Sequence, residues 1–180
     1  MNETRQMFGG LGNRMFQMAY IYSQAKKGLI PDIYLQSEEH FKDAKEDIKK
    51  WYGTDLFENN YVSLHIRRGD YTDNPFYVDL TQTDYYDKAL AEFSPQTEYL
   101  VFCADRQNED VDDRDQDWCL EWIRKKGINA YLHTGKDEIS DFNTMAGCKG
   151  HIIANSSFSW WAAYIGGGKT VAPKQWFTDG

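Results

Sequence analysis

Short apolar runs alternate with segments of helical length along the second two thirds of this chain. The apolar runs are rich in valine, isoleucine, leucine, tyrosine and phenylalanine, which is typical of buried strands. We expect these strands at residues 61–66, 98–103, 128–132, 151–154 and 169–172. Helices are predicted between them, at about 84–93, 115–126, 137–148 and 158–164. Strands that alternate with helices predict a parallel sheet with right-handed crossovers and helices on both faces, which is a doubly wound α/β domain.

The first sixty residues follow a less regular pattern. A glycine-rich segment at 9–12 leads into an apolar run that predicts a helix ending near Lys26. A second, surface helix is expected at 38–51, because Ser37 is a suitable N-cap and acidic residues come first while lysines come last. The chain is therefore expected to comprise a reduced amino-terminal part and a sheet domain, at residues 1–60 and 61–180.

Charge and composition exclude several classes of protein. The 180 residues contain 20 Lys and Arg against 28 Asp and Glu, a net charge of −8. This balance argues against an extended surface for nucleic acid or anionic membrane. An anionic ligand would therefore need a local cluster of positive charge.

Cysteine usage and hydropathy indicate the compartment. Cys103, Cys119 and Cys148 are widely spaced and odd in number, so neither a disulfide framework nor a zinc site is predicted. We expect them to be small buried side chains in a reducing environment. No apolar run approaches the length of a membrane span, and residues 1–6 are too polar for a signal peptide. The sequence therefore predicts a soluble cytoplasmic protein.

Two arginines come directly after the strand expected at 61–66. In an open α/β sheet, ligands bind at the carboxyl ends of the strands, which is where Arg67 and Arg68 would lie. The planar guanidinium group suits phosphate or carboxylate oxygens, because it donates paired hydrogen bonds and keeps its charge. Alternatively, both arginines pair with Asp70 on a solvated loop. The spacing alone leaves both interpretations open.

Further polar residues would reach the same edge. Asp105 follows the strand at 98–103, and Asn155, Ser156 and Ser157 lie where the strand at 151–154 turns into a helix. Serine hydroxyls and the first backbone N–H groups of a helix can bind an anion. The alternative is that one serine is an ordinary N-cap, and the two uses can coexist.

The chain carries several motifs, in the same order, that strongly resemble those of the alpha-1,2-fucosyltransferase family. They lie at residues 9–17, 65–71, 141–148, 151–161 and 171–177. The resemblance implies a metal-independent, inverting transfer of L-fucose from GDP-fucose to a galactose hydroxyl. It also implies a GT-B scaffold, in which two Rossmann-like domains face each other and the carboxyl-terminal one binds the donor. The implied partners are a sugar nucleotide and a glycan acceptor, with no cofactor or metal and with a homo-oligomer possible.

The same resemblance implies roles for individual residues. Arg67 would contact the β-phosphate and stabilise the charge on departing GDP. The donor-binding set would be Arg67, Arg68, Asp105, Asp141, Asn155, Ser156 and Ser157. Asp105 and Asp141 are candidates for ribose or guanine contacts. Asp70 is a candidate base or a residue that orients the arginines, and His65 is a catalytic candidate or a structural strand histidine. The sugar or acceptor side would include Gly10, Gly12 and Asn13.

The amino-terminal part is shorter than the family pattern. Only about fifty residues separate the glycine motif from Arg67 and Arg68. This favours a second interpretation, in which the chain is a silent nucleotide-sugar-binding module or one half of a larger assembly. A third is a carbohydrate-binding protein that uses its many tryptophans and tyrosines.

Overall fold

A five-stranded parallel sheet forms the centre of the protein. The computed structural model describes residues 9–27, 38–53, 55–72, 74–103, 114–135 and 137–178. The strands are β1 (Val62–His65), β2 (Tyr99–Phe102), β3 (Ala130–Leu132), β4 (Gly150–Ile152) and β5 (Lys169–Val171). Their order is β3-β2-β1-β4-β5, with Leu64 of β1 in register with Val101 and Ile152. After β3 the chain therefore crosses back to the other side of β1, where β4 and β5 follow.

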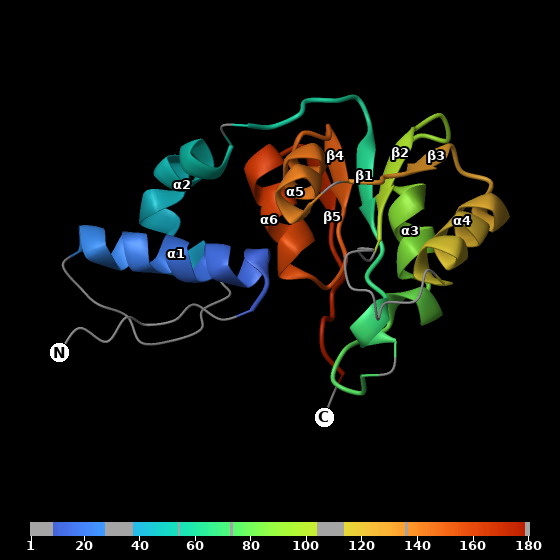
Figure 1. Ribbon diagram of the computed structural model, residues 1–180, viewed down its shortest axis with the longest axis horizontal. Helices are drawn as coiled ribbons and strands as arrows, with labels where there is room; N and C mark the ends of the chain where they lie inside the picture. Colours follow the sequence, from blue (N-terminus) through green and yellow to red (C-terminus); the bar gives the residue numbers. More distant parts are fainter. Residues whose placement is uncertain are drawn as a thin grey trace.

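Helices cover both faces of the sheet, as predicted (Figure 1). The helices α3 (Tyr85–Ala91) and α4 (Arg114–Lys126) cover one face, and α5 (Glu138–Ala146) and α6 (Ser157–Gly166) cover the other. The helices α1 (Leu11–Lys26) and α2 (Lys45–Tyr52) form an outer layer against α6. Short 3-10 turns occur at Glu38–His40, Lys42–Ala44, Gly69–Tyr71 and Leu80–Gln82. This arrangement confirms the doubly wound α/β fold class.

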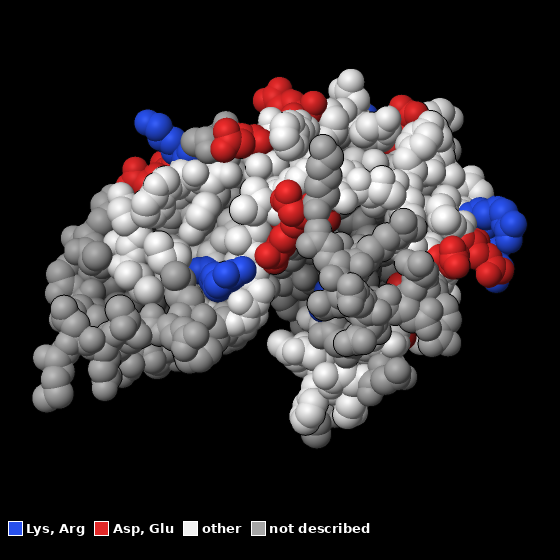
Figure 2. Space-filling view, viewed as in Figure 1, with Lys and Arg blue, Asp and Glu red and all other residues white. Residues whose placement is uncertain are grey.

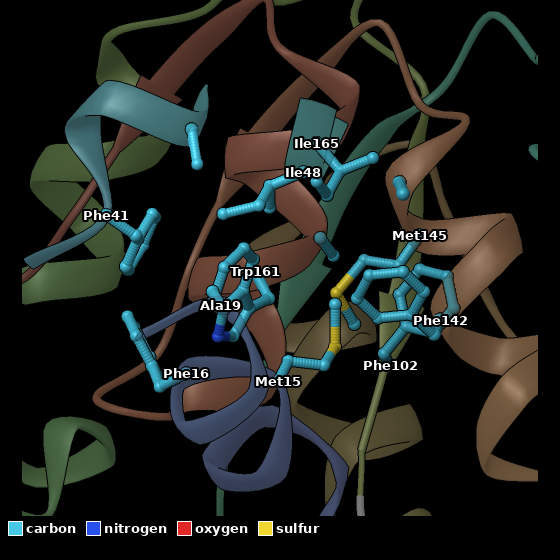
Figure 3. Packing of buried hydrophobic residues seen from close by; sticks show 13 residues of the cluster. Met15, Phe16, Ala19, Phe41, Ile48, Phe102, Phe142, Met145, Trp161 and Ile165 are labelled. Atoms are coloured by element: carbon cyan, nitrogen blue, oxygen red, sulfur yellow. The ribbon is translucent and has the colours of Figure 1, made fainter. Parts of the chain in front are cut away.

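Alternation along the strands divides the buried side chains into two hydrophobic clusters. Val62 and Leu64 of β1 contribute to the cluster under α3 and α4. On the other face, α1, α2, α5 and α6 share a cluster centred on Trp161, which is fully buried (Figure 3). The Trp161 ring lies 4.8 Å from that of Phe16 and stacks at 5.3 Å on Phe41. The packing of these aromatic rings fixes α1 against α6.

The expected surface helix at 38–51 is correct only in its second half. Two 3-10 turns occupy 38–40 and 42–44, and α2 begins at Lys45. Phe41 lies between the turns with φ −135° and ψ 17°, outside the helical region, and it is completely buried. Burial of this ring against Trp161 interrupts the helix, which is a tertiary effect that local propensity cannot predict. The expected cap, Ser37, lies outside the described residues.

The amino-terminal part is packed on the sheet domain. Met15 and Phe16 of α1 and Ile48 of α2 belong to the same cluster as Phe142 and Trp161. The helix expected to end near Lys26 is confirmed as α1. The division of the chain at residue 60 stays a prediction.

Candidate donor site at the carboxyl edge of the sheet

The strand order places β1 and β4 side by side, and their carboxyl ends form the point where the sheet topology switches direction. A ligand crevice is expected at such a point, because the chain leaves the two strands toward opposite sides. Arg67 and Arg68 follow β1, while Asn155 and Ser156 follow β4. The fold therefore brings together, at one edge, the two segments that sequence analysis singled out.

The two arginines point in different directions. The Arg68 Nε donates to Asp115 Oδ1 at 2.8 Å, and its guanidinium carbon lies 4.1 Å from the centroid of the Trp118 ring. Asp115 and Trp118 both belong to α4, so Arg68 ties the end of β1 to that helix and its charge is balanced. The guanidinium carbon of Arg67 instead lies 4.9 Å from the centroid of the Tyr71 ring, and its Nε is buried.

In one of the two interpretations of the sequence, both arginines pair with Asp70. Its backbone belongs to the 3-10 turn Gly69–Tyr71, and its side chain lies outside the described residues. The ion pair that the structure does give Arg68 is with Asp115, which lies 47 positions further along the chain. Arg68 is therefore bound to a helix distant in sequence, and its side chain is 17% exposed. The pairing of the arginines with Asp70 stays a prediction.

The amino termini of α1, α5 and α6 converge beside β1 and β4. The Ser157 hydroxyl donates to Asn13 Oδ1 at 2.8 Å, which joins the first turns of α6 and α1. The Leu11 backbone N–H donates to Glu138 Oε1 at 2.9 Å, which joins α1 to α5. Gly12 lies so close to α6 that a Cβ there would be 2.5 Å from the Ser157 carbonyl carbon.

These helix ends concentrate partial positive charge. The first four N–H groups of a helix have no partner within the helix, and the helix dipole favours an anion at this end. Ser156 is the N-cap residue of α6, with φ −138° and ψ 129°, but within the described residues its hydroxyl makes no capping hydrogen bond. Ser156 therefore has the position of a capping serine without its usual bond, and the start of α6 suits an anionic group.

The side chain of His65, the last residue of β1, is buried against α6. Its side chain is 7% exposed, and its ring centroid lies 6.2 Å from that of Phe158. Among the described residues its buried Nδ1 has no hydrogen-bond partner. Burial, and secondarily the charge of Arg67, lower the pKa of His65 to about 3. The imidazole is therefore neutral at pH 7 and a weak base, which favours the structural interpretation of this residue.

Asp141 lies one turn into α5 and contacts the segment that follows β3. Its Oδ1 lies 3.0 Å from His133 Nε2. Gly135 makes this approach possible, because a Cβ at that position would be 1.3 Å from the same carboxylate oxygen. The carboxylate is thus held between a histidine and a residue that has no side chain.

Asn155 supports the edge of the sheet. It is 2% exposed, and its Nδ2 donates to the backbone oxygens of Val78 and Trp176, at 2.9 and 3.0 Å. Both amide hydrogens are therefore committed to main-chain acceptors. This geometry indicates that Asn155 positions two neighbouring segments, and its place in the donor-binding set stays a prediction.

The structure brings most of the predicted residues together. Gly12, Asn13 and Ser157 are in direct contact, Gly10 accepts the Arg14 backbone hydrogen bond at the start of α1, and His65, Arg67 and Ser156 share the same edge. Asp105 lies outside the described residues. Sequence analysis missed Asp115, His133 and Glu138 as positioning residues. An acidic residue in a first helical turn is common, so the sequence contains no signal that pairs Glu138 with Leu11.

The described residues contain neither a metal-binding cluster nor a membrane-spanning helix. Within the described ranges, no group of three or more His, Cys, Asp and Glu side chains is placed to hold a metal ion. None of the described helices is long and apolar enough to cross a membrane.

Comparison with known proteins identifies the family. The model of the family described as "Glycosyl transferase family 11" matches residues 34–179, which is well over half of the chain. The chain belongs to glycosyl transferase family 11. The resemblance of its motifs to the alpha-1,2-fucosyltransferases is thereby confirmed.

Curated relatives of this family 11 chain are bacterial and mammalian. It is 31% identical to an alpha-1,2-colitosyltransferase of Escherichia coli, over 84% of this chain and 57% of the relative. It is 32% identical to an O-antigen biosynthesis glycosyltransferase of Escherichia coli, over 66% of this chain and 39% of the relative. It is 30% identical to galactoside alpha-(1,2)-fucosyltransferase 1 of Rattus norvegicus, over 62% of this chain and 29% of the relative. The chain thus spans between 29% and 57% of the length of these relatives. No solved structure matches it.

Proposed function

We propose that this chain carries the donor-binding half of a GT-B alpha-1,2-glycosyltransferase. The proposed reaction is the inverting transfer of L-fucose from GDP-fucose to a galactose hydroxyl, without a metal ion. The observation that carries this proposal is the position of Arg67, which follows β1 at the switch point beside the amino terminus of α6. A guanidinium group and a helix amino terminus at one edge suit a nucleoside diphosphate.

In this proposal Arg67 and the first turn of α6 bind the diphosphate. As the bond between the sugar C1 and the β-phosphate oxygen breaks, negative charge develops on GDP. Arg67, the α6 N–H groups and the Ser156 hydroxyl would stabilise that charge, while Ser157, whose hydroxyl donates to Asn13, would contribute its backbone N–H. Arg68 would act indirectly, because its bond to Asp115 fixes the segment that carries Arg67. Asp141, oriented by His133, stays the candidate for a ribose or guanine contact.

The acceptor oxygen would attack C1 from the face opposite the diphosphate. Asp70 stays the candidate base, or a residue that orients the arginines. The low pKa of His65 argues against that residue as the proton acceptor. Gly10, Gly12 and Asn13 line the start of α1 beside α6, which agrees with their proposed place on the sugar or acceptor side.

Two observations favour specific alternatives. The name of one relative, alpha-1,2-colitosyltransferase, makes a colitosyl donor the second candidate. The chain spans 57% of that relative, so a donor-binding module that needs a partner for turnover is the other alternative.

The first test is titration of GDP into the purified protein by calorimetry without added metal, with UDP as comparison. Removal of charge-assisted hydrogen bonds worth about 1.5–3 kcal/mol predicts that Arg67→Ala weakens GDP binding by about 10- to 150-fold. Arg124→Ala is the matched control, because Arg124 is exposed in the last turn of α4, near the opposite edge of the sheet. Equal GDP affinities for the wild type and Arg67→Ala would reject the proposed donor site.

Turnover is tested separately. GDP release is measured with methyl β-galactoside as acceptor and with GDP-fucose or the GDP ester of colitose as donor. Faster release with one donor identifies the transferred sugar. Binding of GDP without release from either donor would select the silent-module alternative.

A further inference from the structure

A short two-stranded ribbon projects from the carboxyl edge of the sheet. It joins residues 74–78 to 175–178 through an antiparallel bridge between Tyr77 and Phe177. The Val78 N–H donates to Trp176 O at 3.2 Å, and the Thr178 N–H donates to Phe76 O at 3.1 Å. The Asn155 amide donates to Val78 O and Trp176 O, which are on opposite strands of the ribbon. The ribbon is therefore fixed to the segment that follows β4.

A row of aromatic rings leads from Arg67 along one face of this ribbon. The Arg67 guanidinium lies 4.9 Å from the Tyr71 centroid, and Tyr71 stacks on Tyr77 with centroids 4.0 Å apart and planes 12° apart. The Phe177 ring follows at 5.6 Å from Tyr77 and is 54% exposed. The row starts at the proposed diphosphate site and ends in solvent.

Phe76 precedes Tyr77 in a turn that the Tyr77 N–H closes by donating to Asn74 O at 3.2 Å. Among the described residues, no ring contact joins Phe76 to Tyr71, Tyr77 or Phe177. Phe76 is 73% exposed. The ribbon thus carries two exposed phenylalanines, of which only Phe177 continues the row.

The ribbon is uncharged. Residues 74–78 and 175–178 contain no Asp, Glu, Lys or Arg, although the chain as a whole has a net charge of −8. In Figure 2 the described surface at the lower end of the molecule, where this ribbon lies in Figure 1, is white, and the outline is hollowed between it and the α1 side. Charged residues flank these segments, at Asp79 and Lys174, but the exposed rings themselves carry no charge, which suits a neutral ligand.

We propose that the row formed by Tyr71, Tyr77 and Phe177, here called the aromatic row, is a subsite for the acceptor saccharide. This inference rests on the proposed donor site. A sugar presents a face of C–H groups with slight positive charge, which packs well against the negative face of an aromatic ring. The acceptor must reach the sugar that leaves the diphosphate, and the aromatic row begins at Arg67. A neutral saccharide bound on Phe177 would therefore lie on the same row of rings that begins at the proposed donor site.

The binding test uses methyl β-galactoside as the probe, in saturation-transfer NMR with and without GDP. Phe177→Ser is expected to lower the transferred signal several-fold and to weaken galactoside binding by about 3- to 10-fold. Phe177→Tyr keeps a ring at this position and is expected to restore the signal. Phe76→Ser is the matched control, because it removes a more exposed phenylalanine from the same ribbon and should leave binding unchanged.

The kinetic readout separates a binding role from a structural one. Phe177→Ser should raise KM for the galactoside about 3- to 10-fold, while kcat and the Kd for GDP change by less than twofold. Unchanged galactoside binding in Phe177→Ser, or equal losses in Phe177→Ser and Phe76→Ser, would overturn the proposal.

The oligomeric state shows whether a second copy of the chain, instead of a saccharide, covers the aromatic row. A wild type that is dimeric by light scattering and becomes monomeric in Phe177→Ser, with galactoside binding unchanged, would show that the row is an interface between copies and would overturn the saccharide subsite. The proposed function fails separately, if the wild type does not bind GDP. The galactoside signal without GDP still tests the aromatic row in that case.

Discussion

The contact between α1 and α6 can be tested by adding a single methyl group. Gly12 lies in the first turn of α1, and a Cβ there would be 2.5 Å from the Ser157 carbonyl carbon and 2.6 Å from the Phe158 nitrogen. These are main-chain atoms of a helix, so they cannot rotate aside as a flexible side chain could. Gly12→Ala is therefore expected to push α1 away from α6.

The size of the effect follows from opposing contributions. Alanine in place of glycine inside a helix would by itself stabilise the fold by about 0.5–1 kcal/mol. Overpacking against rigid neighbours costs about 1–3 kcal/mol, and loss of the bond between Ser157 and Asn13 costs about 0.5–1.5 kcal/mol. We expect a net loss of about 1–3 kcal/mol, which for a domain of this size lowers Tm by roughly 2–12 °C.

Gly10→Ala is the matched control, two residues earlier in the same segment. Among the described residues, the one atom within 4 Å of a Cβ at Gly10 would be Glu138 Oε1, at 3.8 Å, which is an ordinary contact. Differential scanning calorimetry should therefore show Gly10→Ala within about 2 °C of the wild type, because surface changes are usually within about 0.5 kcal/mol. A Gly12→Ala protein that melts at or above the wild-type temperature would refute the close approach of α1 to α6. GDP titration of the same two variants would show whether this packing also shapes the proposed donor site.

Two further predictions concern buried polar groups. Burial lowers the pKa of His151 to about 4, below the value of about 6.5 that is usual in an unfolded chain. Between these two pH values unfolding takes up a proton, so stability is lost as the pH falls from 6.5 toward 4. Between pH 7 and pH 5, the unfolding free energy measured in urea should therefore fall by about 2 kcal/mol less for His151→Gln than for the wild type. Equal decreases would contradict a buried, neutral imidazole. Asn155→Ala leaves the oxygens of Val78 and Trp176 without their donor, so it should lower the unfolding free energy by about 1–3 kcal/mol in the same assay. A change below the error of the assay would show that water or another donor replaces the amide.

The sequence predicts the elements of this fold better than their arrangement. All five strands and the helices between them lie where the hydrophobic pattern indicated, with strand ends that differ by no more than two residues. The alternation also predicts parallel strands and right-handed crossovers. It does not determine that β1 lies between β2 and β4, because that order depends on which faces the helices bury. Similarly, Phe41 interrupts the expected helix and stacks on Trp161, a contact between residues far apart in the sequence.

The candidate site shows the same division. The rule that parallel strands end at one edge was sufficient to bring Arg67 and Ser157 to the same region, and the structure confirms that placement. Contacts between distant residues were not predictable, as for Leu11 with Glu138, which are 127 positions apart. The bonds from the Asn155 amide to two backbone oxygens were equally unpredictable. No local pattern distinguishes an asparagine that contacts a ligand from one that holds two loops.

The adjacent arginines have different environments for a reason that strand geometry supplies. Side chains alternate between the faces of an extended chain, so residues 65 and 67 share one face and residues 66 and 68 share the other. Ile66 belongs to the cluster under α3 and α4, and Arg68 accordingly pairs with Asp115 of α4. His65 contacts α6 through Phe158, and the charge of Arg67 contributes to its lowered pKa. Arg68 therefore fixes the loop to α4. Arg67 lies on the other face, beside the amino terminus of α6, which is where we propose that a diphosphate binds.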